Sequence, residues 1–462
     1  MITTNNKLII MILMAAGFIG SLSQNLLTSA LPSIMTALMV DVAIAQWLTM
    51  IYVLVLGVIT AISAYMFYRF PTKKLVQASL ATFLLGCVIA FCAQNFYILL
   101  FARVIQAFGA GILIPLLQMV VLYIFPPEKQ GQALGLTGII VGFAPAIGPT
   151  LSGVLVDAFG WRSIFLLLIS VSAVVLIAGQ FILKDIGERQ INHLDFLSLS
   201  LYSIGFVSFM LSVTLMKSGS IFKPEIIGLF FIGIVCLAIF AKRQLKLPEP
   251  LLKLSLFKYR SLVFGVILLC ISYVIMMAGT IFLPLYIQTI CGYSATISGL
   301  IMLPGSLLIA ALSPATGKLV DRFGASQLCF IGMIFLTMGN IPFVFFDNHT
   351  ALSMICIAYI VRSIGLAFLI TACTTLGVQN LPQIDKAQGT AIQNSLRQMS
   401  GSLFSTILVV VATIISFPST ISVSGMQISF LLMTSMTIIG LLISFLSIRT
   451  KQQSSNRTPI NL

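Results

Sequence analysis

Apolar runs of about twenty residues recur along the whole length of this 462-residue chain. Each run is long enough to cross the roughly 30 Å hydrocarbon core of a bilayer as an α-helix. Hydrophobic residues make up 59% of the chain and charged residues only 8%, whereas soluble domains carry about 25% charged residues. So much apolar surface requires lipid around it, and the sequence therefore predicts a membrane protein.

About fourteen membrane spans are predicted from these runs. They lie near 8–31, 44–68, 74–93, 96–124, 131–156, 163–183, 195–216, 225–241, 261–289, 293–317, 325–346, 350–380, 387–416 and 424–448. The runs are continuous and do not alternate with period two, which excludes a transmembrane β-barrel and predicts an all-α membrane protein. The first run is too long, and at Ser21, Ser23 and Gln24 too polar, for a cleaved signal peptide, so we expect it to be the first span.

The net charge of +14 is distributed unevenly between the two sides of the predicted membrane. Of the 25 Lys and Arg residues, only Arg162, Lys217 and Lys223 fall on the outer side, and Arg103, Arg362 and Arg397 fall within spans. The rest gather on one side, which by the positive-inside rule predicts that both termini are cytoplasmic. Because no basic domain stands outside the membrane, we expect the lipid bilayer and no nucleic acid as partner.

Residues that could support enzymatic chemistry are missing from the sequence. There is no nucleotide-binding loop, no cluster of histidines and no Ser-His-Asp arrangement, which argues against an enzyme and against ATP-driven transport. The eight cysteines lie mostly inside apolar spans without metal-ligand spacing, so we expect no disulfide, no metal site and no cofactor. The remaining expectation is a secondary active transporter.

An internal repeat divides the chain. Gln130-Gly131 recurs as Gln388-Gly389, 258 positions later, and Arg103 recurs at nearly the same offset as Arg362. Two six-helix bundles in the same orientation with two extra helices between them would account for this repeat. We expect an N-terminal bundle at 1–190, the two extra helices at 191–245, and a C-terminal bundle with a short cytoplasmic tail at 246–462.

The predicted fifth helix carries small residues and prolines at helical spacing. Gly138, Gly142, Pro145, Pro149 and Gly153 recur at intervals of three and four residues and line one helix face. Such a face can approach a neighbouring helix closely, and the prolines bend the helix. A single Gly-x-x-x-Gly more often indicates ordinary packing, but the full run from Gly142 to Gly153 is more specific.

This run resembles the antiporter signature of the fifth helix in the major facilitator superfamily, within the drug/proton antiporters with fourteen membrane helices. Arg103, Gln106, Gly109 and Gly111 are similar to the family's fourth-helix motif, in which the arginine is linked to proton coupling. The resemblance covers nearly the whole chain. It implies a major facilitator fold of 14 transmembrane helices arranged 6+2+6.

The function that this resemblance implies is multidrug efflux. Such a transporter would export small amphiphilic drugs, including fluoroquinolone-like compounds, in exchange for protons, working as a monomer in the plasma membrane of a Gram-positive bacterium. A transporter of one specific metabolite on the same fold is the alternative, although the glycine and proline run speaks against it.

Gly317 to Gly324 resembles the family's cytoplasmic loop of the form Gly-x-x-x-Asp-Arg-x-Gly, which latches the two halves together in one state. Asp321 is expected to accept hydrogen bonds from a helix N-terminus or to pair with an arginine. In the other half Phe67 occupies the corresponding position, which predicts a weaker latch there. The resemblance makes these residues candidates for coupling or gating: Asp321, Arg322, Gly142, Pro145, Gly148 and Pro149.

Three arginines, Arg103, Arg362 and Arg397, fall within predicted spans. An arginine at that depth costs several kcal/mol unless it faces a polar cavity or a partner, so each is a candidate for coupling or gating. For Arg362 the alternative is a side chain near a helix end that reaches back to the surface.

All eleven acidic residues fall in loops or near span ends. Ser23 stands where the family's cation exporters have an aspartate, so strongly cationic compounds are expected to be poorer substrates than zwitterionic or neutral amphiphiles. Asp41 and Asp157, near the outer span ends, are the candidate proton carriers, because desolvation can raise a carboxyl pKa.

A substrate cavity needs apolar walls with a few hydrogen-bonding groups, and flexible methionine allows such walls to repack. Polar and flexible residues in four predicted spans meet this description: Ser23, Gln24, Asn25, Thr28, Trp47, Tyr52, Gln118, Tyr273, Met276 and Met277. For any one of them alone, simple packing between helices is an equally good interpretation.

Overall fold

The computed structural model describes residues 4–40, 42–187, 195–215, 223–415 and 423–455. The first part of the chain forms α1 (Thr4–Leu38), α2 (Val42–Ala45), α3 (Trp47–Ala61), α4 (Ser63–Arg69), α5 (Thr72–Phe91), α6 (Phe96–Ile124), α7 (Gln130–Phe159) and α8 (Arg162–Ile182). α9 (Phe196–Leu215) and α10 (Pro224–Lys246) follow. The last part forms α11 (Arg260–Leu285), α12 (Ala295–Phe323), α13 (Ala325–Asn340), α14 (Leu352–Val378), α15 (Lys386–Ile415) and α16 (Val423–Ser455).

The described residues fold as helices without strands, so the predicted all-α class is confirmed. Twelve helices are long and apolar enough to cross a membrane, and thirteen if α3 and α4, which meet at 49°, form one broken span. The twelve do not include α7, a helix of 30 residues. The predicted number of fourteen spans includes α7 and stays a prediction.

Local sequence sets several helix ends. The side-chain oxygen of Asn95 accepts a hydrogen bond from the backbone nitrogen of Ile98 at 2.9 Å and caps the start of α6. At the end of α12, Gly324 adopts a φ of 93°, which only glycine takes up without strain. The last glycine of the loop motif therefore ends one helix and turns the chain into α13.

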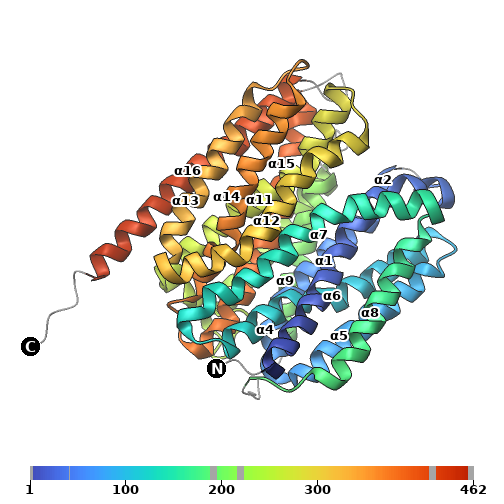
Figure 1. Cartoon of the computed structure of the whole chain (residues 1–462). Helices are drawn as coiled ribbons and strands as arrows, with labels where there is room; N and C mark the ends of the chain where they lie inside the picture. The colour runs from blue at the N-terminus through green and yellow to red at the C-terminus, as the bar shows by residue number, and fades with distance from the viewer. Residues whose placement is uncertain (1–3, 41, 188–194, 216–222, 416–422, 456–462) are drawn as a thin grey trace, which may run out of the picture.

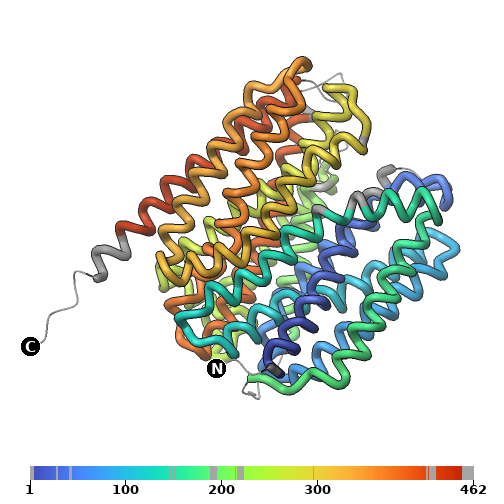
Figure 2. Tube along the Cα trace, in the orientation of Figure 1, coloured from blue at the N-terminus to red at the C-terminus, as the bar shows by residue number. Residues whose placement is uncertain are grey.

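The helices form two groups that lie side by side, one drawn in blue to green and the other in yellow to red (Figures 1 and 2). In the first group α1 packs against α6, α7 and α8, and α5 packs against α6 and α8. In the second group α11 packs against α14, α15 and α16, and α13 packs against α14 and α16. One helix of each group contacts helices of the other group: α7 contacts α12 and α14, and α15 contacts α3 and α6.

The extra pair, α9 and α10, pack on each other, and α9 also contacts α3 of the first group and α15 of the second. A salt bridge joins the two helices of the pair: the carboxylate of Asp195, directly before α9, lies 2.8 Å from Nε of Arg243 in α10. That hydrogen bond lowers the pKa of Asp195 to about 2. The predicted boundary at 190 lies outside the described residues, so the three domain ranges stay predictions.

Glycines of α7 allow very close contact with α12. A Cβ added at Gly135 would lie 2.7 Å from the carbonyl oxygen of Ser313, and one at Gly142 would lie 2.4 Å from Ile309 Cγ2. Further along, Gly148 faces α1 instead, with Asn25 Cβ 2.7 Å from its added Cβ, and Gly153 has no such neighbour within 4 Å. α7 therefore touches α12 over its first half and separates from it over its second half.

We expect Gly135→Ala to destabilise the protein and Gly153→Ala to leave it unharmed. The alanine methyl at position 135 meets a backbone oxygen that cannot move away, which costs about 1–3 kcal/mol. At position 153 the space is open, so an alanine methyl meets no other atom. The better helix propensity of alanine is then expected to raise the free energy of unfolding by up to about 1 kcal/mol. Thermal unfolding of the two detergent-purified variants measures both effects. Equal unfolding temperatures would contradict the close α7–α12 contact.

Candidate functional site

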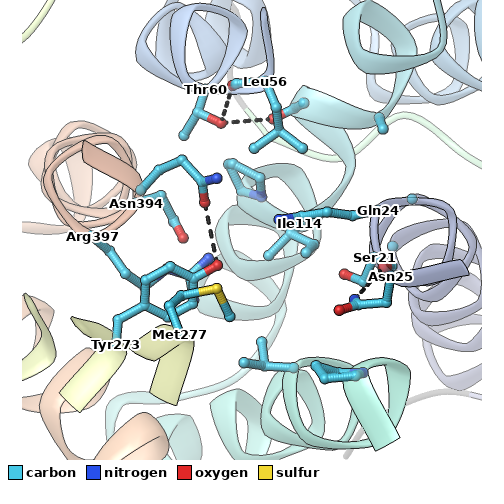
Figure 3. A pocket seen from close by; sticks show the side chains of 18 of the residues that line it. Ser21, Gln24, Asn25, Leu56, Thr60, Ile114, Tyr273, Met277, Asn394 and Arg397 are labelled. Carbon is cyan, nitrogen blue, oxygen red and sulfur yellow. Dashed lines mark hydrogen bonds between the residues drawn. The ribbon is translucent and has the colours of Figure 1, made fainter. Parts of the chain in front are cut away.

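A cavity lies between the two groups of helices. The first group contributes residues of α1, α3, α6 and α7, and the second contributes residues of α11 and α15. The lining residues are Gly17, Gly20, Ser21, Gln24, Asn25, Leu56, Thr60, Ala110, Gly111, Ile114, Pro115, Val141, Pro145, Tyr273, Met276, Met277, Asn394, Arg397 and Gln398. Figure 3 shows Tyr273, Met277, Asn394 and Arg397 on one side of this space and Ser21, Gln24 and Asn25 across from them.

Half of the predicted substrate residues meet in this cavity: Gln24, Asn25, Tyr273, Met276 and Met277. Asn25 Nδ2 donates to the carbonyl oxygen of Ser21 at 2.8 Å, as Figure 3 shows. Tyr273 and the two methionines supply apolar surface, and the amides of Gln24 and Asn25 supply polar groups. Sites for small molecules combine such groups.

The other predicted substrate residues lie elsewhere. Trp47 is partly buried and packs against the core of the first group, and Gln118 is buried behind the cavity. Ser23 and Tyr52 surround Arg103 instead of lining the cavity. The side chain of Thr28 lies outside the described side chains.

Arg103 is completely buried in the first group. Its Nη1 donates to Ser23 Oγ at 3.0 Å and to Gln106 Oε1 at 2.7 Å, and its Nε donates to the carbonyl oxygen of Leu48 at 3.2 Å. The guanidinium carbon lies 4.0 Å from the centre of the Tyr52 ring. The charge is thus stabilised by neutral acceptors and by a cation–π contact, and no carboxylate takes part among the described residues.

These contacts tie three helices together, because Arg103 belongs to α6, Ser23 to α1 and Leu48 to α3. Tyr52 of α3 adds a link to α1, since its hydroxyl donates to the carbonyl oxygen of Gly20 at 2.8 Å. Gly20 lines the cavity. Arg103 therefore holds one wall of the cavity in place from behind.

Arg362, the repeat counterpart of Arg103, is also buried. Its Nη2 donates to the carbonyl oxygen of Ile275, and its guanidinium carbon lies 5.8 Å from the centre of the Tyr359 ring. Glycines make room for it: a Cβ added at Gly339 would lie 2.3 Å from the Arg362 backbone nitrogen. The side chain stays inside the second group and does not reach back to the surface.

Arg397, predicted as a coupling or gating residue, lines the cavity itself. Its guanidinium carbon lies 4.9 Å from the centre of the Tyr273 ring. Asn394, one turn before Arg397, and Gln398, the residue directly after it, line the cavity as well but were missing from the predicted substrate residues. Their polar side chains at positions i, i+3 and i+4 of an apolar span are the signal that would have identified them.

Asn394 also joins the two groups, since its Nδ2 donates to Gln118 Oε1 of α6 at 2.5 Å. Pro145 of α7 lines the cavity, while Gly142 and Gly148 pack α7 against α12 and α1 respectively. The side chain of Pro149 lies outside the described side chains. Small residues of α7 thus contact protein on both sides of Pro145, at Gly142 and Gly148, whereas a Cβ added at Gly153 would have no neighbour within 4 Å.

Asp321 closes one end of the bundle. Its Oδ1 accepts a hydrogen bond from the backbone nitrogen of Gly131 at 2.8 Å, and its Oδ2 accepts one from Gln132 at 2.8 Å. These nitrogens belong to the first turn of α7, where unpaired N–H groups and the helix dipole favour a negative charge. Asp321 was predicted to bind either a helix N-terminus or an arginine, and in the structure it binds the N-terminus of α7. Arg322 is exposed and stacks on Phe323.

The corresponding contact in the other half uses a tyrosine. Phe67 is buried, and the next residue, Tyr68, donates from its hydroxyl to the carbonyl oxygen of Ile384 at 2.5 Å. Nearby, Lys386 Nζ donates to Gln130 Oε1 at 2.9 Å. A neutral hydrogen bond therefore stands here where the second half uses a carboxylate, and the predicted weaker latch stays a prediction.

Of the two candidate proton carriers, only Asp157 belongs to the described residues, and it does not line the cavity. Asp157 is exposed near the end of α7, and Asp41 lies outside the described residues. Within the described part of the chain, no Asp or Glu lines the cavity, and no group of three or more His, Cys, Asp or Glu side chains is placed to hold a metal ion.

We expect Arg103→Lys to destabilise the protein more than Ser23→Ala. A lysine ammonium cannot reach the three diverging acceptors at once, and a buried acceptor left unpaired costs about 1–3 kcal/mol. Ser23→Ala removes one hydrogen bond while Gln106 and Leu48 keep theirs, which costs about 1 kcal/mol. Thermal unfolding in detergent compares the two. An Arg103→Lys variant as stable as the wild type would refute this view of Arg103.

Comparison with known proteins agrees with this architecture. The family model of the Major Facilitator Superfamily matches residues 13–406. Over 461 residues, 98% of each chain, this chain is 34% identical to "Uncharacterized MFS-type transporter YcnB" of Bacillus subtilis (strain 168). It is 35% identical over 396 residues to the lincomycin resistance protein LmrB of the same organism, covering 85% of this chain and 82% of that one.

A solved structure supports the fold. The crystal structure of the human organic anion transporter MFSD10 (TETRAN) matches with a TM-score of 0.70 at 13% identity, covering 96% of this chain and 100% of that one. An identity this low shows the fold alone. From the family match and the helical architecture it follows that this chain belongs to the Major Facilitator Superfamily and is a membrane transporter, not an enzyme.

Proposed function

We propose that this chain exports small amphiphilic compounds in exchange for protons, by opening the central cavity to one side of the membrane at a time. The observation that carries the proposal is the position of the cavity between two groups of helices, where α7 packs closely on α12 over its first half and leaves it over its second half. A site at such a boundary can open first to one side of the membrane and then to the other when one group of helices rocks against the other.

The closed end of the bundle is the end with the basic loops. Asp321 binds the first turn of α7 there, and Gly131 to Gly142 pack tightly against α12. By the positive-inside rule this end faces the cytoplasm, with both termini. With this orientation we infer a state closed to the cytoplasm, in which the cavity opens inward when the hydrogen bonds of Asp321 and Tyr68 break.

Export is favoured over uptake by two observations. The glycine and proline run of α7 resembles the signature of exporters, and LmrB is named as a resistance protein. The resemblance to the quinolone efflux pump NorC of Gram-positive bacteria adds fluoroquinolone-like zwitterions to the proposed substrates. The proposed transporter is a functional monomer of fourteen spans, arranged 6+2+6, in the plasma membrane of such a bacterium.

Expression in a bacterial host that lacks its own multidrug pumps is expected to raise tolerance to norfloxacin severalfold. An uncoupler should abolish the effect, because secondary transport depends on the ion gradient. Minimal inhibitory concentrations with and without uncoupler measure both. Gly135→Leu is the matched control: at equal membrane abundance its larger side chain keeps α7 from closing on α12 and should remove the tolerance. Unchanged tolerance with the wild-type chain would argue for a specific metabolite transporter, which counterflow of candidate solutes into vesicles can identify.

Proton coupling is assigned to a carboxyl group near the outer span ends. We expect Asp157→Asn or Asp41→Asn to abolish efflux driven by a pH gradient, because an amide cannot carry the proton, while downhill exchange of substrate continues. Reconstituted vesicles with an imposed pH gradient measure the first process, and exchange without a gradient measures the second. Efflux that responds to the pH gradient equally in both variants would exclude both residues as proton carriers.

A further inference from the structure

The cavity carries one kind of charge. Arg397 is the charged side chain among its lining residues, and the rest are neutral. No Asp or Glu of the described residues reaches the lining. A positive charge without a counter-charge makes the cavity electrostatically unsuited to cations and suited to anions.

Arg397 also lacks a hydrogen-bond acceptor. Its side chain is only 7% exposed, and its Nε has no hydrogen-bond partner among the described residues. Arg103 Nη2 and Arg362 Nε also have no partner among the described residues. However, Arg103 donates from its other nitrogens to three acceptors and Arg362 donates to the carbonyl oxygen of Ile275, whereas the side chain of Arg397 makes no such bond among the described residues. Their donors serve the packing of the helices, whereas the guanidinium of Arg397 meets the face of Tyr273.

A buried guanidinium with unused donors is costly, and the cost is recovered when an anion binds. The planar guanidinium fits a carboxylate with two parallel hydrogen bonds, which a single amide or ammonium group does not match. The substrate would supply the missing acceptor.

The surroundings of Arg397 suit the rest of an amphiphile. Figure 3 places Arg397 beside Tyr273 and Met277 and across from Gln24. The hydroxyl of Tyr273 is held by Gln398, to which it donates at 3.3 Å. An aromatic ring can therefore pack on Met277 and Tyr273 while its acidic group meets Arg397 and its polar groups meet Gln24.

We propose that Arg397 binds an acidic group of the transported compound, so that the substrates are aromatic or amphiphilic carboxylates, either as anions or as zwitterions. This inference rests on the proposed function, because it names the substrate class of the same cavity. It also changes the role of Arg397 from the coupling or gating residue that the sequence predicted to a substrate-binding residue.

Three fluorescent compounds with one ring system test the inference: dansylglycine, which carries a carboxylate, its neutral amide dansylglycinamide, and the cationic dansylethylenediamine. Binding to the detergent-purified chain is followed by dansyl fluorescence. We expect the carboxylate to bind about tenfold to a hundredfold more tightly than the amide, the range of a charge-assisted hydrogen bond. The cation should bind most weakly.

Substitutions assign the preference to one residue. Arg397→Gln should weaken dansylglycine binding at least about tenfold and change dansylglycinamide binding little, which a merely structural role would not do. Arg397→Lys keeps the charge without the planar geometry and should retain part of the preference, so it also serves if the glutamine variant fails to fold. Arg449→Gln is the matched control, because Arg449 is exposed on α16 and stacks on Phe445 away from the cavity.

Each outcome has a distinct meaning. Equal binding of carboxylate and amide by the wild type, or an equal loss of both in Arg397→Gln, would overturn the inference. Transport of the three compounds by reconstituted vesicles tests the proposed function separately. A chain that binds the carboxylate selectively but transports none of the compounds would refute export while the binding site stands, and one that exports all three equally would refute the site while export stands.

Discussion

The close contact between α7 and α12 is the constraint on which the rest of the structure depends. Glycines at 131, 135, 138 and 142 let the two helices approach until the added Cβ of each would meet atoms of the other. Asp321 at the end of α12 then reaches the first turn of α7. Because α7 leaves α12 beyond this stretch, the cavity lies between the two groups and not inside either one.

Three arginines lose the hydration of their charge when they are buried, and each has different partners in place of water. Arg103 meets neutral oxygens of three helices, so its charge stabilises the packing of the first group. Arg362 meets the carbonyl oxygen of Ile275 and fits into space left by Gly279 and Gly339. Arg397 meets only an aromatic face, and its unused donors lie at the cavity. The first two are related by the repeat and serve structure, whereas the third is outside the repeat pattern and serves binding.

Residue patterns predicted the helices and the small-residue face of α7 because apolar length and glycine spacing are local properties of the sequence. The same patterns did not predict which polar residues of one helix line the cavity and which contact another helix. Ser23, Gln24 and Asn25 are consecutive in α1, yet Ser23 turns to Arg103 while Gln24 and Asn25 turn to the cavity. Successive residues of a helix point about 100° apart, so the partner helices decide which of them lines a site. Asn394 and Gln398 were missed for a different reason, since their spacing with Arg397 already marks one polar face of an apolar span.

The sequence by itself determined that this chain lives in a membrane as helices, that short motifs of its first part recur in its last part, and that three arginines must find acceptors inside. These properties follow from apolar length, charge and self-similarity, which need no knowledge of helix packing. Only the tertiary structure decided that Asp321 binds a helix N-terminus, that Tyr68 stands in for the missing carboxylate of the first half, and that Arg397 faces the cavity. Each of these depends on contacts between residues far apart in the chain, and such contacts are set by how closely the helices pack.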